Sequence, residues 1–140
     1  MGNSNSTMAQ QIAQAASDYE RQNRGHVPQS VSVVLSDSTL VVTLHGALSP
    51  AEKALALSPD GAMQLQEFHQ RLFANSLHAL RQEIKRITGV EVRDAAVEIE
   101  PASGAVMKVF TTGAVVQVFL LSQSVPAESW SGNLPCNSST

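Results

Sequence analysis

The chain has 140 residues, of which 43% are hydrophobic and 15% charged, a composition that fits one folded domain with a sizeable core. The net charge of −3 argues against nucleic-acid binding, because proteins of that class usually carry a basic surface. The one cysteine, Cys136, excludes an internal disulfide or a multi-cysteine metal site, and no apolar run reaches the ~18 residues that a membrane span needs. We therefore expect a cytoplasmic domain without direct membrane insertion and without a bound cofactor.

The first structured segment is predicted to be a short helix. Residues 1–6 are polar and we expect them to be disordered, whereas apolar residues recur at helical spacing from Thr7 to about Gln22. Thr7 can cap the start of this helix. The segment Asn23 to Pro28 (NRGHVP) then breaks it, because Gly25 suits a C-terminal cap and a proline cannot continue the helix.

The segment from Ser30 to Gly46 (SVSVVLSDSTLVVTLHG) predicts a β-hairpin. Side chains alternate along both halves, and Asp37 and Ser38 occupy the turn, where their side chains can bond to the backbone. One face of the hairpin is fully apolar and the other is mixed. This pattern suits a sheet that helices cover on one side.

A short helix is predicted within Leu48 to Ala56 (LSPAEKALA). Ser49 is placed as the N-cap, Pro50 as the first helical residue, and Glu52 as the three-residue partner of a capping box. Pro59 ends this helix, and the next one begins shortly after it.

The long helix expected from Ala62 to Thr88, ended by Gly89, carries two overlapping apolar stripes. A stripe of this kind is buried against a sheet or a partner helix. Because both stripes cannot easily face one small sheet, we expect a second chain to bury the remainder and the protein to be a homodimer. The stripes are Leu65, Phe68 and Leu72, and Phe73, Leu77, Leu80, Ile84 and Ile87.

The segment Val90 to Glu100 (VEVRDAAVEIE) predicts a strand whose inward parity changes, which a β-bulge around Asp94 to Ala96 would reconcile. Ser103 to Leu121 then contains nearly the same motif twice, as GAVMKVF and GAVVQVF. We interpret the two copies as a second hairpin with its turn at Thr112-Gly113. A duplicated ligand site is the alternative, but no helix N-terminus follows the glycines.

In that second hairpin Lys108 would face Gln117. The pair is either a shallow patch that attracts an anionic group, or a lysine whose methylene stem covers neighbouring phenylalanines. The face around Lys108 and Gln117 would consist of Val106, Phe110, Val115 and Phe119.

Residues 122–140 are rich in Ser, Pro, Asn and Gly, and we expect a flexible tail with Trp130 as its one possible anchor.

Residues able to carry catalysis are scattered along the chain. His69 and His78 are nine positions apart on one helix, on roughly opposite faces, so they form no i,i+4 metal pair. No G-x-S-x-G, Walker lysine loop, HExxH or G-x-G-x-x-G motif occurs. We therefore expect no enzymatic activity, and catalysis by His45 with Glu52 is a weaker alternative.

Two segments, Arg24 to Ala56 and Ile87 to Phe110, together resemble the MpsC-like family, a bacterial family long catalogued as a domain of unknown function. Two departures are an inserted His26-Val27 before Pro28 and Ala96 to Ile99 in place of a polar run. The second motif copy lies beyond the usual family end, where an extra edge strand would alter a partner-binding surface. The matching positions are Leu44, Gly46, Leu48, Ser49, Ala51, Glu52, Lys53, Thr88 and Gly89.

The resemblance implies a soluble accessory or regulatory subunit of a membrane-potential-generating, cation or inorganic-carbon uptake system. We accordingly expect one α+β domain over residues 7–121, with an N-terminal helix, a β-hairpin, a short and a long helix, and two or three further antiparallel strands. It would act by binding a membrane-transport subunit or a small ligand, and a small-ligand-binding stress or metabolic sensor is the alternative. The candidate binding residues are Lys53, Glu52, His45, Lys108 and Gln117.

Overall fold

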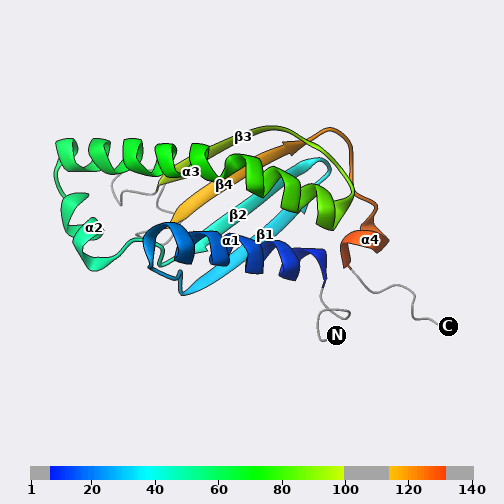
Figure 1. Ribbon diagram of the computed structural model, residues 1–140, viewed down its shortest axis with the longest axis horizontal. Coiled ribbons are helices and arrows are strands. Elements are labelled where there is room, and N and C mark those ends of the chain that lie inside the picture. The colour runs from blue at the N-terminus through cyan, green and yellow to red at the C-terminus, as the bar shows by residue number, and fades with distance from the viewer. Residues whose placement is uncertain (1–6, 100–113, 132–140) are drawn as a thin grey trace.

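The computed structural model describes residues 7–99 and 114–131, and it contains one four-stranded sheet with helices along one face (Figure 1). The predicted α+β class is confirmed. The expectations for residues 1–6 and for the first motif copy lie outside the described residues. The elements are α1 (Met8–Arg24), β1 (Ser30–Ser36), β2 (Thr39–His45), α2 (Pro50–Leu55), α3 (Pro59–Thr88), β3 (Val92–Ile99), β4 (Val115–Leu121) and α4 (Ala127–Ser131).

The strands lie in the order β1-β2-β4-β3, and each neighbouring pair is antiparallel. β1 and β2 form the predicted hairpin, in which Ser36 pairs with Thr39 across a turn at Asp37 and Ser38. Asp37 has a φ of 58°, a left-handed conformation that aspartate tolerates better than most residues. The predicted hairpin and its turn are therefore confirmed.

β4 is an interior strand and not one half of a second hairpin. Its residues pair with β2 on one side and with β3 on the other, so both of its hydrogen-bonding edges are occupied. The predicted pairing of Gln117 with Lys108 is therefore wrong, because Gln117 lies between Val42 and Val97. For the same reason the second motif copy is not an extra edge strand. Lys108 itself lies outside the described residues.

The bulge predicted in the third strand is present, slightly earlier than expected. The pairing of β3 with β4 shifts between Val92 and Asp94, which leaves Arg93 as the extra residue. A bulge restores the parity of side chains on either side of it, and Val92 and Val97 are accordingly both buried.

Local capping signals explain where the two long helices begin and end. Thr7 caps α1 through a capping box, and α1 continues to Arg24 before Gly25 ends it with a φ of 73°. α3 begins at Pro59, earlier than predicted, because the side chain of Ser58 accepts a hydrogen bond from the first turn. Both differences lie at helix ends, where the apolar periodicity carries little information.

α3 buries most, but not all, of its two apolar stripes, because α1 and the sheet contact it from different sides (Figure 1). Leu65 of the first stripe is 2% exposed, whereas Phe68 of the same stripe points outward. Phe68, 44% exposed, is therefore the part of the stripes that this chain leaves uncovered, and the homodimer stays a prediction. The second stripe contributes Phe73, Leu80, Ile84 and Ile87 to the core, and Phe73 packs against Phe119 of β4.

The folded region continues past residue 121, where we expected the domain to end. Val125 is buried, and the short helix α4 follows it. Trp130 of this helix packs against the core, which agrees with its expected role as an anchor. The first part of the segment expected to be a flexible tail is thus ordered by apolar contacts.

Candidate functional site

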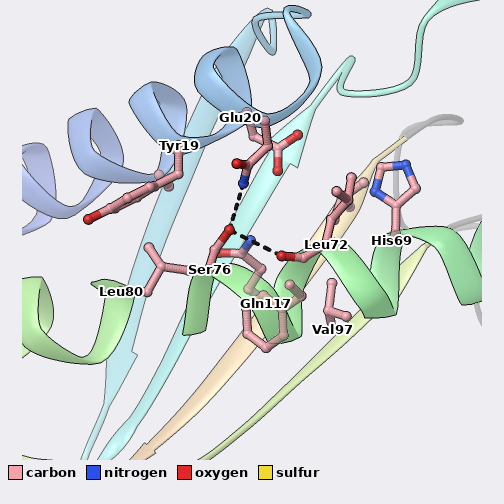
Figure 2. Close-up of a pocket in the computed structure, with 12 residues that line it drawn as sticks. Tyr19, Glu20, His69, Leu72, Ser76, Leu80, Val97 and Gln117 are labelled. Carbon is pink, nitrogen blue, oxygen red and sulfur yellow. Dashed lines mark hydrogen bonds between the residues drawn. The ribbon is translucent and has the colours of Figure 1, made fainter. Parts of the chain in front are cut away.

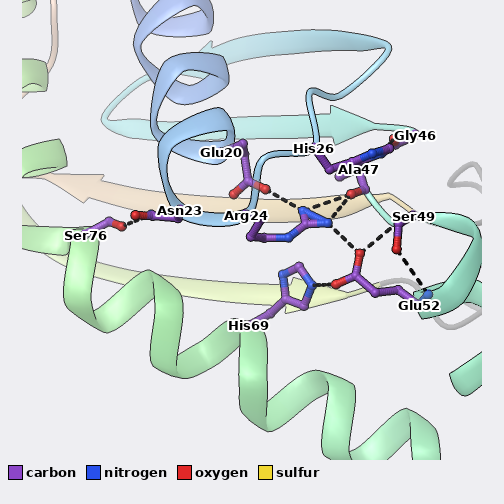
Figure 3. A network of polar contacts seen from close by, with 10 residues as sticks. All are labelled: Glu20, Asn23, Arg24, His26, Gly46, Ala47, Ser49, Glu52, His69 and Ser76. Atoms are coloured by element: carbon purple, nitrogen blue, oxygen red, sulfur yellow. Dashed lines mark hydrogen bonds and ion pairs between the residues drawn. The ribbon is translucent and has the colours of Figure 1, made fainter.

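Arg24, the last residue of α1, lies at the centre of a buried polar network (Figure 3). Its Nη1 donates to Glu20 Oε1 at 2.7 Å, and its Nη2 donates to Glu52 Oε1 at 2.5 Å. Both nitrogens also donate to the carbonyl oxygen of Ala47, at 2.9 and 2.6 Å. A single guanidinium therefore joins α1 to the loop after β2 and to α2, a use for which its planar fork of donors is suited.

Glu52 connects the same network to α3. Its Oε1 accepts from the backbone N–H of Ser49 at 2.8 Å, and Ser49 Oγ accepts from the N–H of Glu52 at 3.2 Å, so the predicted capping box is confirmed. Its Oε2 lies 3.0 Å from Nε2 of His69 in α3. One carboxylate thus caps α2 and links α1, α2 and α3. We call Glu20, Arg24, Glu52 and His69 the buried clamp.

The surroundings of the clamp set the charge of its members. Burial alone would raise the pKa of Glu52, but the Ser49 N–H and the Arg24 guanidinium outweigh burial and bring this pKa below 4.5. Burial lowers the pKa of His69 below 6.5, and the positive charge of Arg24 acts in the same direction. Near pH 7 Glu52 is therefore ionised and His69 is neutral, with its Nε2–H donating to the carboxylate.

The four predicted binding residues that the structure describes do not gather at one place. Glu52 belongs to the buried clamp, whereas the adjacent Lys53 is exposed on α2. His45 ends β2, with its Nε2 3.0 Å from Ser32 Oγ, so it and Glu52 contact different partners. Gln117 is buried in β4, and Lys108 lies outside the described residues.

Sequence reasoning missed Arg24, Glu20 and His69 as members of a site. Glu20 and Arg24 stand four residues apart on one helix, a spacing that allows an ion pair. His69 stands four residues after Leu65 and four before Phe73, so helical periodicity alone places it on the buried face. These signals could have identified the residues as buried, but not their contact with Glu52.

A second feature is a group of exposed apolar side chains in α2, in the turn that follows it and in the first turns of α3, which we call the α2–α3 corner. It consists of Leu55, Leu57, Met63 and Phe68, of which Leu57 is 87% and Met63 is 64% exposed. The Phe68 ring also contacts the ring of His69 edge-on, with centroids 5.6 Å apart. The corner therefore adjoins the buried clamp, although its own apolar side chains face solvent.

The backbone of the corner is closely packed. A Cβ atom added to Gly61, in the first turn of α3, would lie 1.9 Å from the carbonyl oxygen of Leu55. Only glycine allows this approach of the two backbones. The exposed side chains of the corner therefore project from two helices whose backbones are in close contact.

Two features are absent from the described part of the chain. Within residues 7–99 and 114–131, no three His, Cys, Asp or Glu side chains gather closely enough to hold a metal ion. No helix in these ranges has the length and apolar character needed to cross a membrane.

Fold and site together define a single-domain α+β protein in which buried ion pairs clamp three helices. A family model described as "Na+-translocating membrane potential-generating system (MpsC)" matches residues 4–114, and the chain therefore belongs to the MpsC family. It is also 24% identical over 110 residues to "Uncharacterized protein YbcI" of Bacillus subtilis (strain 168). The aligned region covers 79% of this chain and 89% of that protein. No solved structure matches the chain. The family match ends just before β4, so this interior strand lies outside it.

Proposed function

We propose that the chain is a non-catalytic accessory or regulatory protein of a membrane cation or inorganic-carbon uptake system, and that it binds a membrane-embedded protein subunit of that system from the cytoplasmic side. The family description, which names a Na+-translocating membrane-potential-generating system, supports the link to such a system. A protein that regulates a membrane-embedded partner needs a surface that the partner can bury.

The α2–α3 corner is the observation that carries this proposal. Large apolar side chains that cluster on a surface are a marker of protein–protein contact, because their exposure is unfavourable unless a partner covers them. Leu57 and Met63 are the most exposed large apolar side chains among the described residues. The clamp and the close approach at Gly61 hold the two helices together, so little conformational entropy is lost when a partner binds.

The chemistry of the clamp favours a structural role for these residues over a catalytic one. Glu52 and His69 have shifted pKa values and are buried, two features that are common in active sites. Both groups, however, are directed at each other, and Arg24 neutralises Glu52. The arrangement is suited to holding helices in place.

Crosslinking and pulldown from membranes of the native cell test the proposal. We expect the full chain to capture an integral membrane subunit, and the double variant Leu57→Ser/Met63→Ser to weaken that capture by about tenfold or more, as for other central interface residues. Val34→Ser is the matched control, because Val34 is 57% exposed on β1, away from the corner. Both variants should keep a stability within about 0.5 kcal/mol of the wild type.

Two outcomes would contradict this assignment. Equal loss of capture in Val34→Ser and in the corner variant would place the contact elsewhere. The second outcome is that the corner binds another copy of this chain, in keeping with the predicted homodimer. Light scattering that shows a dimer dissociated by the corner substitutions, with no membrane subunit captured, would therefore assign the corner to self-association.

A further inference from the structure

The cavity between α1, α3 and the sheet is too small for a ligand. Side chains of both helices and of β4, among them Tyr19, Ser76, Leu80 and Gln117, fill this space (Figure 2). The cavity that remains has a volume of about 10 Å³, which holds at most one water molecule. A further binding function is therefore expected at the surface, where the two edges of the sheet differ.

β1 and β3 are the edge strands of the sheet, and of the two it is β3 that is protected against pairing with another chain. β3 has exposed charges at Arg93 and Asp94 and a bulge between Val92 and Asp94, two features that prevent pairing at natural sheet edges. β1 (SVSVVLS) has no charged residue and no proline, and it pairs with β2 without a register shift. An uncharged, regular edge of this kind is a template for an added strand.

The direction of the hydrogen bonds identifies the free backbone groups of β1. Leu121 donates its N–H to the carbonyl oxygen of Ser38 at 2.8 Å, so Ser38 is directed at β4 and the next residue, Thr39, at β1. Thr39 pairs with Ser36, and the direction alternates along an antiparallel strand, so every second residue back from Ser36 bonds to β2. The intervening residues direct their N–H and C=O groups to the free edge, and these groups have no backbone partner among residues 7–99 and 114–131. They are Val31, Val33 and Leu35.

The side chains of these three residues form the apolar border of the core. They pair across the hairpin with Leu44, Val42 and Leu40, which are at most 1% exposed. They themselves are only half-buried, because no strand of the described chain lies on their outer side. α1 packs over β1 on this face of the sheet (Figure 1). A strand added at the edge would therefore bury its inward side chains against α1 and this border.

A second copy of the whole chain does not fit this edge. Because α1 lies over β1 (Figure 1), a two-fold axis between two antiparallel β1 strands would bring the copies of α1 to about one strand spacing, ~4.8 Å, from each other. The axes of packed helices lie about 8–10 Å apart, so the two helices would overlap. The edge therefore requires an extended segment that places no helix of its own over β1.

We propose that the free edge of β1 binds an extended, uncharged segment of a partner protein, which joins the sheet as a fifth, antiparallel strand. Three residues with one free donor and one free acceptor each allow six backbone hydrogen bonds. In this mode of recognition the main chain supplies affinity and alternate side chains supply specificity. The bound segment should present apolar side chains towards α1 and small polar ones on the opposite side, as β1 itself does. The edge belongs to a different element from the α2–α3 corner, so this inference does not rest on the proposed function.

Amide hydrogen exchange of the full chain, followed by NMR, tests the edge with a defined probe. The probe is a synthetic peptide of the β1 sequence, SVSVVLS, followed by two lysines for solubility. In the free chain we expect the amides of Val31, Val33 and Leu35 to exchange quickly and those of Ser32 and Val34 slowly, because only the latter two are bonded to β2. The peptide at about ten times its Kd should slow exchange at the first three about tenfold, since only the unbound chain exchanges.

Two N-methylated peptides are the matched controls. Methylation at the position of Val33 removes an N–H that faces the chain, and should weaken binding by about tenfold or more. Methylation at the position of Val34, whose N–H faces away, should leave binding nearly unchanged. Absence of protection by the unmodified peptide, or equal protection by the two methylated peptides, would overturn the proposal.

A substitution in the chain gives a second test of the same edge. Val33→Pro removes an N–H that has no backbone partner, and proline is tolerated at such edge positions, so the variant should fold and should lose the peptide-induced protection. Protection that persists in a folded Val33→Pro protein would overturn the proposal. If Val33→Pro does not fold, the two methylated peptides decide.

Discussion

The buried clamp and the α2–α3 corner lie side by side but reverse the usual distribution of side chains. Arg24, Glu52 and His69 are charged or polar and are largely buried, whereas Leu57 and Met63 are apolar and exposed. Inside, pairing offsets the cost of burying charges. Outside, nothing in the described part of the chain covers the apolar side chains. The clamp is thus explained by the stability of this fold, whereas the exposed corner is the surface that we propose a partner covers.

The largest expected effect is the loss of Arg24. Arg24→Met would leave Glu20 and Glu52 buried without their cation, and should destabilise the protein by about 3–5 kcal/mol. Urea denaturation measures this loss. Arg21→Met is the control, since the Arg21 side chain is 57% exposed in its pair with Asp18, against 5% for Arg24, and it should cost less than about 1 kcal/mol. Similar losses in the two variants would mean that the clamp does not differ from a surface ion pair.

A second prediction concerns the backbone junction between the two regions. Gly61→Ala would ordinarily stabilise a helix by about 1 kcal/mol, but here the new methyl would meet the Leu55 carbonyl oxygen. We therefore expect a destabilisation of about 1–3 kcal/mol by the same measurement. Ala74→Gly, at an exposed position of α3, should show the ordinary cost of glycine. A stabilised Gly61→Ala protein would show that the junction can open without cost.

Substitutions at Ser49 and Lys53 distinguish the side of α2 that joins the clamp from the side that faces solvent. Ser49→Ala removes the cap of α2, and should cost about 1 kcal/mol. Lys53→Ala should leave the stability nearly unchanged, because Lys53 is exposed. If Lys53→Ala unfolds the protein as readily as Ser49→Ala does, this part of α2 has a purely structural role. Loss of partner capture by a folded Lys53→Ala protein would extend the corner to this residue.

The smallest expected effect is a pH dependence that arises from the clamp. The pKa values of both His69 and Glu52 are lowered in the folded state. The unfolded state therefore binds protons more readily, and stability should fall on acidification, first below about pH 6.5 through His69 and then below about pH 4.5 through Glu52. His69→Gln should remove the first phase in urea titrations at successive pH values, and His78→Gln, at an exposed position, should keep it. An unchanged profile in His69→Gln would assign the acid sensitivity to another group.

Much of the fold could be predicted because its signals are local. The cap at Ser49, the turn at Asp37 and the C-terminal glycines at Gly25 and Gly89 depend on residues within one turn of the chain. The buried face of α3 follows from helical periodicity in the same way. The bulge in β3 could also be predicted, because an inserted residue is the usual cause of a change of side-chain parity within one strand.

The candidate site was only partly predictable. Glu52 was recognised as a cap, but its bonds to Arg24 and His69 span 28 and 17 residues, and no periodic pattern encodes contacts of that kind. The position of β4 was likewise undetermined. A mostly apolar strand such as VVQVFLL fits many places in a sheet, and similarity between the two motif copies wrongly favoured pairing them with each other.

The amino-acid sequence by itself determined the helices, the first hairpin and the α+β class, because these depend on interactions between near neighbours and on the period of apolar residues. Only the tertiary structure decided which strands flank β4, and therefore that Gln117 is buried between Val42 and Val97. It also decided that Arg24, Glu52 and His69 meet while Leu57 and Met63 stay exposed. The reason is physical: burial and charge pairing depend on how distant segments are arranged in space, and strand order and helix packing fix that arrangement only when the whole domain folds.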